Sequence, residues 1–246
     1  MMISIDGKQY VCDSGEYILD VAKREGIEIP TLCHHGGLVG QGCCRVCIVE
    51  VEQSGKRSIV TACIFPVEQE CKVFTNSEDV IRQRKMILSL LQSLAPDSNE
   101  VSLLCEAYGA QKFERFITQE NGKCILCGLC VKACESLGTG AISTAQRGIE
   151  KVVTTPYNEP SAVCVGCSSC AAVCPTAAIA VGENWEERKM WNRSFLFKIC
   201  KKCGAKVGTL AELMRSAQKT NSEIPELCEN CRKKTIADAL AETYGS

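Results

Sequence analysis

Two runs of eleven residues decide how this chain folds. The first, CILCGLCVKAC, occupies residues 124–134, and the second, CVGCSSCAAVC, occupies residues 164–174. Both have the spacing C-x2-C-x2-C-x3-C, and each is followed by a short apolar stretch, at 140–143 and at 177–180, which we expect to form a strand. The chain from residue 116 to 181 is therefore an internal repeat, and we expect both halves to have the same local structure.

Four cysteines within eleven residues favour iron–sulfur ligation over zinc, because zinc sites usually use two separated pairs. Pro175 follows the second run, as in the two-cluster ferredoxins of bacteria, where the fourth cysteine of each run binds the cluster of the other run. Gly128 and Gly166 suit a backbone that passes close to sulfide and directs N–H groups at it. The predicted ligand sets for two [4Fe–4S] clusters are Cys124, Cys127, Cys130 and Cys174 for the first, and Cys134, Cys164, Cys167 and Cys170 for the second.

The composition agrees with metal binding. The chain has 20 cysteines in 246 residues, and its N-terminus shows no secretory signal, so the short cysteine spacings indicate metal ligation in a reducing cytoplasm more than disulfides. The longest apolar runs fall well short of a membrane span. With a net charge of −1 and basic residues spread along the chain, we expect no nucleic-acid partner.

A third cysteine set lies in the N-terminal part of the chain. Cys33, Cys44, Cys47 and Cys63 have the spacing C-x10-C-x2-C-x15-C, with a glycine-rich loop before the middle pair. The plant-type [2Fe–2S] pattern is similar but has a shorter first gap. Predicted strands at 2–5, 9–12, 46–51, 57–60 and 72–74, with a helix at 17–25, supply the β-rich frame of such a domain.

Two alternatives concern this N-terminal set. Cys43 adjoins Cys44, but the two-residue gap to Cys47 favours Cys44 as the ligand. His34 and His35 raise the possibility of a Rieske centre, which would need a histidine after Cys44, and none follows. We therefore interpret both histidines as loop residues beside a [2Fe–2S] cluster.

Between the cysteine-rich regions, the sequence predicts two helices. Acidic residues follow Ser77, and apolar residues recur at helical spacing up to residue 94. A second helix is expected at 99–108, ending before Gly109. This pair is expected to be a spacer that docks two cluster domains.

A polar connecting stretch at 183–193 leads to a fourth set, Cys200, Cys203, Cys228 and Cys231. Two C-x2-C pairs predict a structural zinc site, although the 24 residues between them exceed the usual gap. A further iron–sulfur cluster stays open as the alternative, since the lysines and arginines that flank the pairs would suit either centre. Sixteen predicted ligands leave four cysteines, expected to be buried as small apolar residues: Cys12, Cys43, Cys71 and Cys105.

The residues IPTLC at 29–33 and GCCRVCIVEV at 42–51, together with the two cysteine runs, carry a family resemblance. Residues 1–182 resemble the N-terminal iron–sulfur region shared by [FeFe]-hydrogenases, NAD-dependent formate dehydrogenase α subunits, diaphorase γ subunits of NAD-reducing hydrogenases and the complex I large iron–sulfur subunit. Together with the C-terminal cysteine pairs, which lie outside the resemblance, it implies an α+β chain with four parts. These are a β-grasp [2Fe–2S] ferredoxin domain at 1–76, a helical linker at 77–116, a bacterial-type 2[4Fe–4S] domain at 117–183 and a small zinc-ribbon-like unit at 184–246.

The chain departs from that family in two respects. The family usually carries an additional cluster between the two domains, but the matching stretch 89–110 holds only Cys105 and no histidine, so we predict that this cluster is absent. Hydrogenase and formate dehydrogenase members also continue into a large catalytic domain, whereas this chain has the small cysteine-pair unit there.

The resemblance implies a non-catalytic, cytoplasmic electron-transfer subunit. Its expected partners are a flavoprotein that reacts with NAD(P)(H) and a hydrogenase, formate dehydrogenase or similar catalytic subunit, in a complex of the electron-bifurcating kind; soluble ferredoxin is a further candidate partner. An enzyme active on its own is a weaker hypothesis, because Gly138-Thr139-Gly140 is the only hint of a nucleotide loop. The other alternative is a redox sensor or a cluster scaffold.

Overall fold

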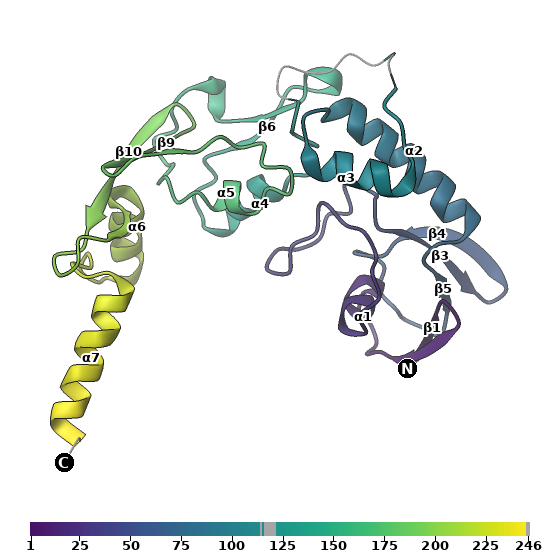
Figure 1. The fold of residues 1–246 in the computed structure, drawn as a ribbon, viewed down its shortest axis with the longest axis horizontal. Helices are drawn as coiled ribbons and strands as arrows, with labels where there is room; N and C mark the ends of the chain where they lie inside the picture. The colour runs from purple at the N-terminus through teal and green to yellow at the C-terminus, as the bar shows by residue number, and fades with distance from the viewer. Residues whose placement is uncertain (114, 116–121, 245–246) are drawn as a thin grey trace. The chain divides into compact units, whose positions relative to one another are not determined.

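The computed structural model describes residues 1–113, 115 and 122–244 (Figure 1). It divides into two compact units, and the division passes through the repeat. The first unit consists of Met1–Ala133, Thr144–Val153 and Val173–Ala178, and the second consists of Cys134–Ser143, Thr154–Ala172 and Ile179–Ser246. Each unit contains one of the two predicted [4Fe–4S] ligand sets. The predicted division at 76, 116 and 183 stays a prediction, and its boundary at 116–117 lies outside the described residues.

The first unit begins with a mixed five-stranded sheet in the order β2-β1-β5-β3-β4. Its strands are β1 (Met2–Ile5), β2 (Lys8–Val11), β3 (Ile48–Gln53), β4 (Lys56–Thr61) and β5 (Lys72–Phe74). Strand β1 pairs parallel with β5, and the other neighbours are antiparallel. The hairpin turn between β1 and β2 at Asp6-Gly7 has positive φ at both residues, as a two-residue turn of type I′ requires.

Helix α1 (Ile18–Arg24) completes the core of this sheet. Its residues Ile18, Leu19 and Val21 are at most 1% exposed and belong to one hydrophobic cluster with side chains from β1, β3 and β5. Each such fully buried aliphatic side chain stabilises the fold by about 1.5–3 kcal/mol. Cys47 and Cys63 belong to the same cluster, so the core directly supports two of the predicted ligands.

The two predicted helices are confirmed to within one residue as α2 (Glu78–Leu94) and α3 (Asn99–Tyr108). The Ser77 and Ser98 side chains cap them by accepting hydrogen bonds from backbone N–H groups, and Gly109 ends α3 in the left-handed conformation. Both helices pack on a second hydrophobic cluster within the first unit, which is described with the sites below.

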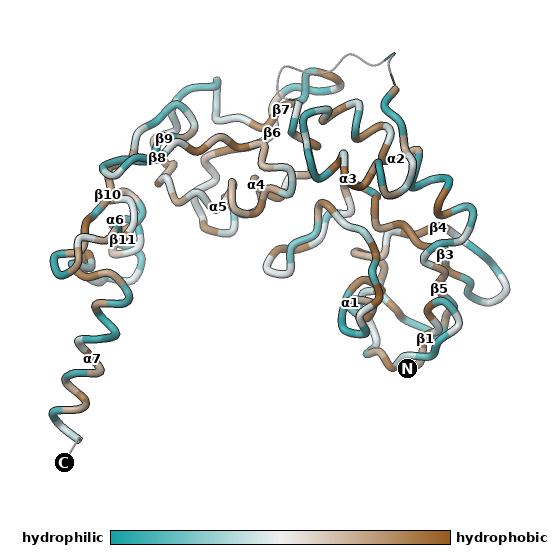
Figure 2. The backbone as a smooth tube through the Cα atoms, in the orientation of Figure 1, coloured by the Kyte–Doolittle hydropathy of each residue, from teal (hydrophilic) through white to brown (hydrophobic). Residues whose placement is uncertain are grey.

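The repeat forms short elements. These are α4 (Leu129–Ser136), β6 (Ser143–Ala145), η1 (Gly148–Glu150), β7 (Val152–Thr154), η2 (Pro156–Asn158) and α5 (Ser169–Ala172). The strands predicted at 140–143 and 177–180 were wrong: β6 starts only at Ser143, and no strand covers 177–180. At both places the backbone N–H groups donate to cysteine sulfur, from Ala141 to Cys134 and from Ala178 to Cys174, and so are not available to a strand ladder. The surroundings of α4 are predominantly apolar (Figure 2).

In the second unit, a four-stranded antiparallel sheet follows the repeat in the order β11-β10-β9-β8. Its elements are β8 (Gly182–Glu183), β9 (Glu187–Met190), β10 (Arg193–Ile199), β11 (Lys206–Thr209), α6 (Leu210–Thr220) and α7 (Glu229–Tyr244). The polar stretch at 183–193, which was expected to be a connecting segment, therefore contains β9, the whole hairpin turn and the first residue of β10.

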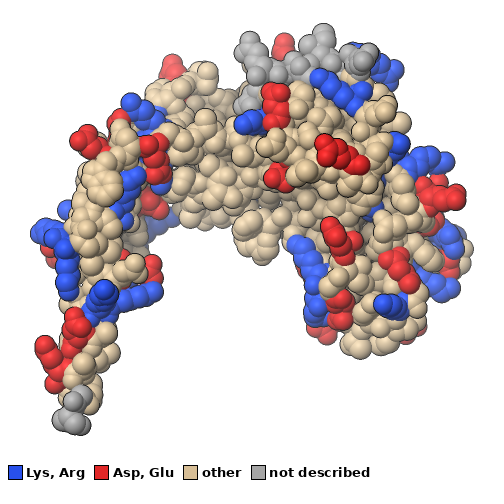
Figure 3. Space-filling view, in the orientation of Figure 1, with Lys and Arg blue, Asp and Glu red and all other residues tan. Residues whose placement is uncertain are grey.

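The surface agrees with the nearly neutral net charge, because lysines and arginines lie among aspartates and glutamates on the face shown in Figure 3. None of the described helices has both the length and the apolar character needed to cross a membrane. The structure thus combines mixed helix and sheet with four groups of cysteines, as expected.

Candidate iron–sulfur and metal sites

The N-terminal set forms two pairs of thiols. Cys33, Cys44, Cys47 and Cys63 are all buried, with exposures of 1–6%. The Cys33 thiol donates to Cys44 and thereby lowers the pKa of Cys44 to about 6, while the pKa of Cys33 is raised. The Cys63 thiol likewise donates to Cys47, which lowers the pKa of Cys47 and raises that of Cys63. Two adjacent pairs of thiols match the needs of a [2Fe–2S] cluster, in which each iron takes two protein ligands.

The glycine-rich loop shapes this site. The Cys44 backbone N–H donates to Cys33 Sγ at 3.3 Å, one of the N–H···S contacts that stabilise thiolate. Gly42 has φ +60°, and a Cβ there would lie 2.6 Å from Cδ1 of Ile64, so the loop requires glycine. The expectation that Cys43 is buried was wrong: it is exposed and its Sγ contacts Gln41, in contrast to buried Cys44.

His34 and His35 make loop contacts. His34 Nδ1 lies 2.9 Å from Lys23 Nζ, and burial lowers the pKa of His34. His35 Nδ1 accepts the Gly37 N–H at 3.2 Å. These contacts agree with the interpretation of both histidines as loop residues.

A buried arginine that sequence reasoning missed holds the backbone at Cys47. Arg84, on α2, is fully buried; its Nε donates to the Val46 carbonyl at 3.0 Å and its Nη2 donates to the Ile48 carbonyl at 2.6 Å. Its other acceptors are the Thr75 carbonyl, the Asn76 side chain and the Tyr108 hydroxyl. Burial lowers the pKa of Arg84, with Tyr108 and Cys47 opposing the shift. The signal was present in the sequence, since Arg84 follows Val80 and precedes Leu88 at helical spacing on the apolar stripe of α2.

The first [4Fe–4S] set brings the fourth cysteine of the second run to the first run. The charge of Cys174 raises the pKa values of Cys124, Cys127 and Cys130, so this thiol lies near all three. Burial, the larger effect, raises the pKa of Cys127 to about 11 and that of Cys130 to about 12. Buried thiols crowded in this way are favourable ligands, because metal binding replaces their protons and compensates their charge.

Backbone N–H groups surround these sulfurs. Leu126 N donates to Cys124 Sγ at 3.4 Å, and Ala178 N donates to Cys174 Sγ at 3.3 Å. Leu126 and Gly128 have positive φ, which turns the loop so that its N–H groups converge. The donor set therefore fits a thiolate-ligated iron–sulfur cluster.

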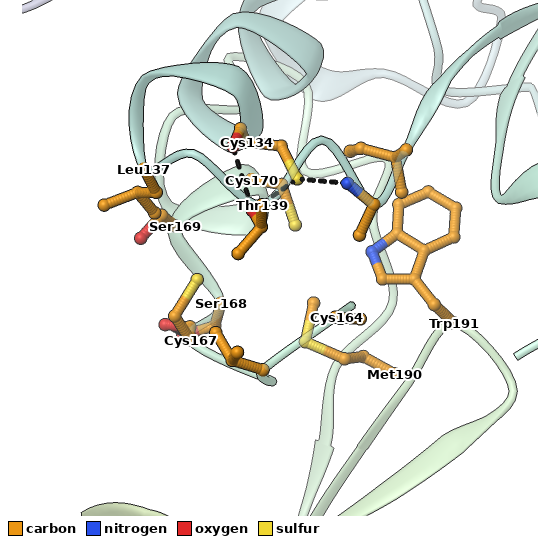
Figure 4. Close-up of a pocket in the computed structure, with 13 residues that line it drawn as sticks. Cys134, Leu137, Thr139, Cys164, Cys167, Ser168, Ser169, Cys170, Met190 and Trp191 are labelled. Carbon is orange, nitrogen blue, oxygen red and sulfur yellow. Dashed lines mark hydrogen bonds between the residues drawn. The ribbon is translucent and has the colours of Figure 1, made fainter. Parts of the chain in front are cut away.

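The second [4Fe–4S] set lines a pocket of the second unit (Figure 4). Its four cysteines, Cys134, Cys164, Cys167 and Cys170, face this pocket from the loop of the second run and from the end of α4. Ala141 N donates to Cys134 Sγ at 3.1 Å, and Thr139 Oγ1 lies 3.1 Å from the same sulfur. The site thus offers four thiols, polar hydrogens and space, which together fit a [4Fe–4S] cluster.

Met190 and Trp191 close one side of this pocket (Figure 4). The Trp191 indole Nε1 is buried and has no hydrogen-bond partner of acceptable geometry among the described residues. Burial raises the pKa of the Cys170 thiol, and the nearby Trp191 indole opposes that shift. Sequence reasoning missed Trp191 because no motif includes it.

The C-terminal set is drawn together more tightly. The Sγ atoms of Cys200, Cys203, Cys228 and Cys231 all lie within 4.8 Å of one another, with 3.6 Å between Cys203 and Cys228. In the part of the chain that the structure describes, this is the one group of cysteine, histidine or acidic side chains found so close together. The backbone N–H of Cys228, with those of Cys203 and Lys202, lowers the pKa of Cys200 to about 6. Neighbouring thiols, Cys203 first, raise the pKa of Cys231 to about 12.

The elements explain this convergence. Cys200 and Cys203 lie in the turn between β10 and β11, where Gly204 has φ +74° and donates to the Cys200 carbonyl at 3.0 Å. Cys228 directly precedes α7, and Cys231 lies in its first turn. The β10–β11 turn and the start of α7 together direct four thiols at one point, as in structural metal sites.

Paired thiols on a mixed sheet, followed by a repeated cysteine loop that brings cysteines of both runs together, define an iron–sulfur protein with two ferredoxin-type domains. Comparison with family models agrees: residues 1–78 match the "2Fe-2S iron-sulfur cluster binding domain" and residues 123–178 match the "4Fe-4S dicluster domain". The chain is an iron–sulfur electron-transfer protein related to subunits of NADH- and NADPH-linked hydrogenases and oxidoreductases.

Curated relatives are larger proteins. The chain is 34% identical over 218 residues to the NADP-reducing hydrogenase subunit HndD of Solidesulfovibrio fructosivorans, a match covering 76% of this chain and 37% of that protein. It is 34% identical over 201 residues to the NADPH-Fe(3+) oxidoreductase subunit alpha of Geobacter sulfurreducens, covering 72% of this chain and 24% of that protein. The chain therefore spans between a quarter and about two fifths of these relatives.

Among solved structures, a chain from the crystal structure of an NAD+-reducing [NiFe]-hydrogenase in the H2-reduced state matches with a TM-score of 0.60. The sequence identity is 26%, and the match covers 72% of this chain and 85% of that chain. The 75 kDa subunit of the NADH-ubiquinone oxidoreductase of Reclinomonas americana is 31% identical over 177 residues, covering 62% of this chain and 25% of that protein.

Proposed function

We propose that this chain relays single electrons between an NAD(P)(H)-reactive flavoprotein and a hydrogenase or similar oxidoreductase subunit, through one [2Fe–2S] and two [4Fe–4S] clusters. The proposed ligands are Cys33, Cys44, Cys47 and Cys63; Cys124, Cys127, Cys130 and Cys174; and Cys134, Cys164, Cys167 and Cys170. When bound, each cluster accepts and releases one electron, while the protein fixes its position and its surroundings.

One observation in the first unit carries this proposal. Cys33 and Cys44 of the N-terminal set and Cys127 of the first [4Fe–4S] set belong to a single buried hydrophobic cluster. The charge of Cys44 contributes to the raised pKa of Cys127, and Gln41 Oε1 lies 3.0 Å from the Cβ position of Gly128. Two ligand sets that meet in one water-poor core suit electron transfer from one site to the other without an intermediate centre.

The helices supply the rest of that core. Leu88 of α2 and Val101 of α3 are fully buried in the same hydrophobic cluster, and buried Cys105 donates to the Leu88 carbonyl at 3.5 Å. The two helices that the sequence predicted as a spacer therefore pack in the same core as the [2Fe–2S] set and the first [4Fe–4S] set. The absence of an additional cluster at 89–110 stays a prediction.

We propose that the C-terminal set binds one zinc ion. With Zn–S bonds of about 2.3 Å, the sulfurs of a tetrahedral site lie about 3.8 Å apart. The 3.6 Å between Cys203 and Cys228, and the 4.8 Å limit that all four sulfurs satisfy, support one ion at their centre. A [4Fe–4S] cluster attaches each thiolate to a different iron and therefore needs wider spacing.

The partners follow from the relatives. Those that match this chain are named as hydrogenase and oxidoreductase subunits that use NADP, NADPH or NADH, which supports a flavoprotein at one end of the relay and a catalytic subunit at the other. We extend this to formate dehydrogenase and soluble ferredoxin as candidate partners, to a complex that bifurcates electrons, and to the cytoplasm, where cysteine thiols stay reduced.

Metal and acid-labile sulfide analysis of the anaerobically purified chain tests the function, together with EPR of the dithionite-reduced sample. We expect about ten irons and one zinc per chain, with separable [2Fe–2S] and [4Fe–4S] signals. Twelve or more irons without zinc would overturn the zinc assignment, and an Fe3+ signal from a mononuclear tetrathiolate site would do the same. Little iron with several zincs would overturn the relay itself.

A further inference from the structure

The hairpin between β9 and β10 turns at two unusual residues. Trp191 and Asn192 connect the paired residues Met190 and Arg193, and they have φ +51° and +56°. A two-residue turn of this kind needs positive φ at both positions and therefore favours Asn-Gly or Asp-Gly. A bulky residue in the left-handed region is strained, and such strain persists only where the surrounding structure imposes it, often at functional sites.

The indole at this strained position also carries an unused polar hydrogen. Its Nε1 is buried and has no partner of acceptable hydrogen-bond geometry among the residues that the structure describes, although the Cys170 thiol lies nearby. The indole nitrogen is directed toward the hollow that Cys134, Cys164 and Cys170 surround (Figure 4). Leaving a buried donor unsatisfied destabilises the folded state. The strain and the missing hydrogen bond together indicate that the partner of this donor is a group that fills the pocket.

Arginines hold the hairpin firmly against the loop of the second run. Arg193 Nη1 donates to the carbonyls of Ser161 at 2.7 Å and Cys164 at 3.1 Å, and Arg188 Nη1 donates to that of Gly166 at 2.5 Å. The Phe195 ring packs on Gly166 so closely that a Cβ there would clash with the ring. Trp191 is therefore positioned by the same loop that carries Cys164, Cys167 and Cys170.

We propose that the Trp191 Nε1–H donates a hydrogen bond to a sulfur of the [4Fe–4S] cluster held by Cys134, Cys164, Cys167 and Cys170, either the Cys170 thiolate or an inorganic sulfide, and so raises its reduction potential. This rests on the proposed function, because it requires a cluster in this pocket. One added electron makes the sulfurs more negative, and an N–H donor stabilises that state more than the oxidised one. Trp191 acts as a positioning and tuning residue and does not itself carry the electron.

The first test compares two tryptophan variants of the full-length, cluster-loaded chain. Trp191→Phe removes the N–H but keeps an aromatic ring, and Trp185→Phe makes the same change at an indole that is 65% exposed. In an EPR-monitored redox titration, we expect Trp191→Phe to lower the ratio of reduced to oxidised second cluster at fixed potential by about tenfold, equivalent to about 59 mV for one electron. Trp185→Phe should leave every midpoint unchanged. An unchanged or raised midpoint in Trp191→Phe overturns the proposal.

The second test needs no substitution and therefore does not depend on how a variant folds. The chain has two tryptophans, so incorporating indole-15N tryptophan labels only two nitrogens. Pulsed EPR of the reduced protein should show a 15N coupling and an exchangeable proton coupling at one [4Fe–4S] cluster. Absence of both couplings overturns the proposal even if Trp191→Phe cannot be loaded.

Failure of this proposal and failure of the proposed function are distinguishable. If iron analysis and EPR find a single [4Fe–4S] cluster, the relay assignment fails at this site. If both clusters are present, but Trp191→Phe shifts no midpoint and no indole 15N coupling is seen, only the tuning role of Trp191 is lost.

Discussion

The two [4Fe–4S] ligand sets have the same backbone and different surroundings. Equivalent loop residues have positive φ in each run. After each run, a further positive-φ residue, Gly140 or Ala177, precedes the alanine whose N–H donates to the fourth cysteine of that run. The first set is packed on a hydrophobic cluster with α2 and α3, whereas the second lines a pocket closed by the β9–β10 hairpin. The repeat thus supplies the proposed cluster ligands, and the segments outside it supply the surroundings that tune each cluster's reduction potential.

The largest expected effect tests how the ligands are divided between the two sets. In the double variant Cys134→Ser/Cys164→Ser, both changes fall in the second set, so one cube should be lost and about four irons with it. In Cys134→Ser/Cys124→Ser, the changes fall in different sets, and both cubes should be lost, about eight irons. Iron analysis of the anaerobically purified variants measures this. If the ligands were grouped by run, the two outcomes would be exchanged.

The next effect separates the C-terminal site from the redox sites. Cys228→Ser should abolish binding of the single metal ion, whose apparent contribution to folding reaches about 10–16 kcal/mol in zinc-finger peptides. We expect zinc to disappear, segment 200–244 to become sensitive to protease and iron to stay at about ten per chain. Cys12→Ser, at a buried cysteine outside the four sets, is the control and should retain zinc. A loss of iron in Cys228→Ser would instead indicate a cluster at the C-terminal site.

A smaller effect concerns the support of the [2Fe–2S] site. Arg84→Met leaves the Val46 and Ile48 carbonyls and three further acceptors without their donor. We expect a loss of roughly 2–5 kcal/mol in the free energy of unfolding, because each buried acceptor left without a donor costs about 1–3 kcal/mol. Arg82→Met, two residues earlier on the exposed face of α2, should cost less than about 0.5 kcal/mol. Denaturant unfolding followed at the [2Fe–2S] visible absorption measures both, and equal losses would contradict the role of Arg84.

The smallest effect sharpens the comparison of the two [4Fe–4S] sites. Thr139 Oγ1 lies 3.1 Å from Cys134 Sγ and also donates to the Cys134 carbonyl at 2.9 Å, whereas Thr176 Oγ1 lies 3.6 Å from Cys174 Sγ. One neutral hydrogen bond is worth about 1 kcal/mol, and the Thr139 hydroxyl shares its single hydrogen between the sulfur and the carbonyl. Thr139→Val should therefore lower the midpoint of the second cluster by less than a full hydrogen bond would, and Thr176→Val should change that of the first cluster less still. Redox titration of both variants checks this order, and a larger shift in Thr176→Val would reverse it.

Much of this structure followed from local signals. Cysteine spacing predicted the four groups of cysteines, whose roles as ligands stay a prediction. Caps and periodicity placed α2 and α3, because N-caps and apolar stripes act within a few residues. The strands expected at 140–143 and 177–180 failed because a short apolar stretch does not reveal that its N–H groups serve a sulfur.

The environment of the sites could not be predicted in the same way. Arg84 reaches carbonyls about 36–38 positions away in sequence, and Arg193 reaches carbonyls 29–32 positions away. Contacts of that length depend on tertiary packing, which periodicity does not encode. Trp191 lay in a polar stretch without a motif, and only its buried nitrogen and positive φ distinguish it.

The turn at Trp191 and Asn192 has a consequence for how the protein matures. Asn-Gly turns start hairpins locally, but a tryptophan in the left-handed conformation opposes this, so β9 and β10 gain little from their own turn. Their pairing should therefore form late, once Arg188 and Arg193 find the carbonyls of the loop at 161–166. We expect the pocket to stay accessible in the newly made chain, which leaves a route for the cellular assembly machinery to insert iron and sulfide before the hairpin seals it.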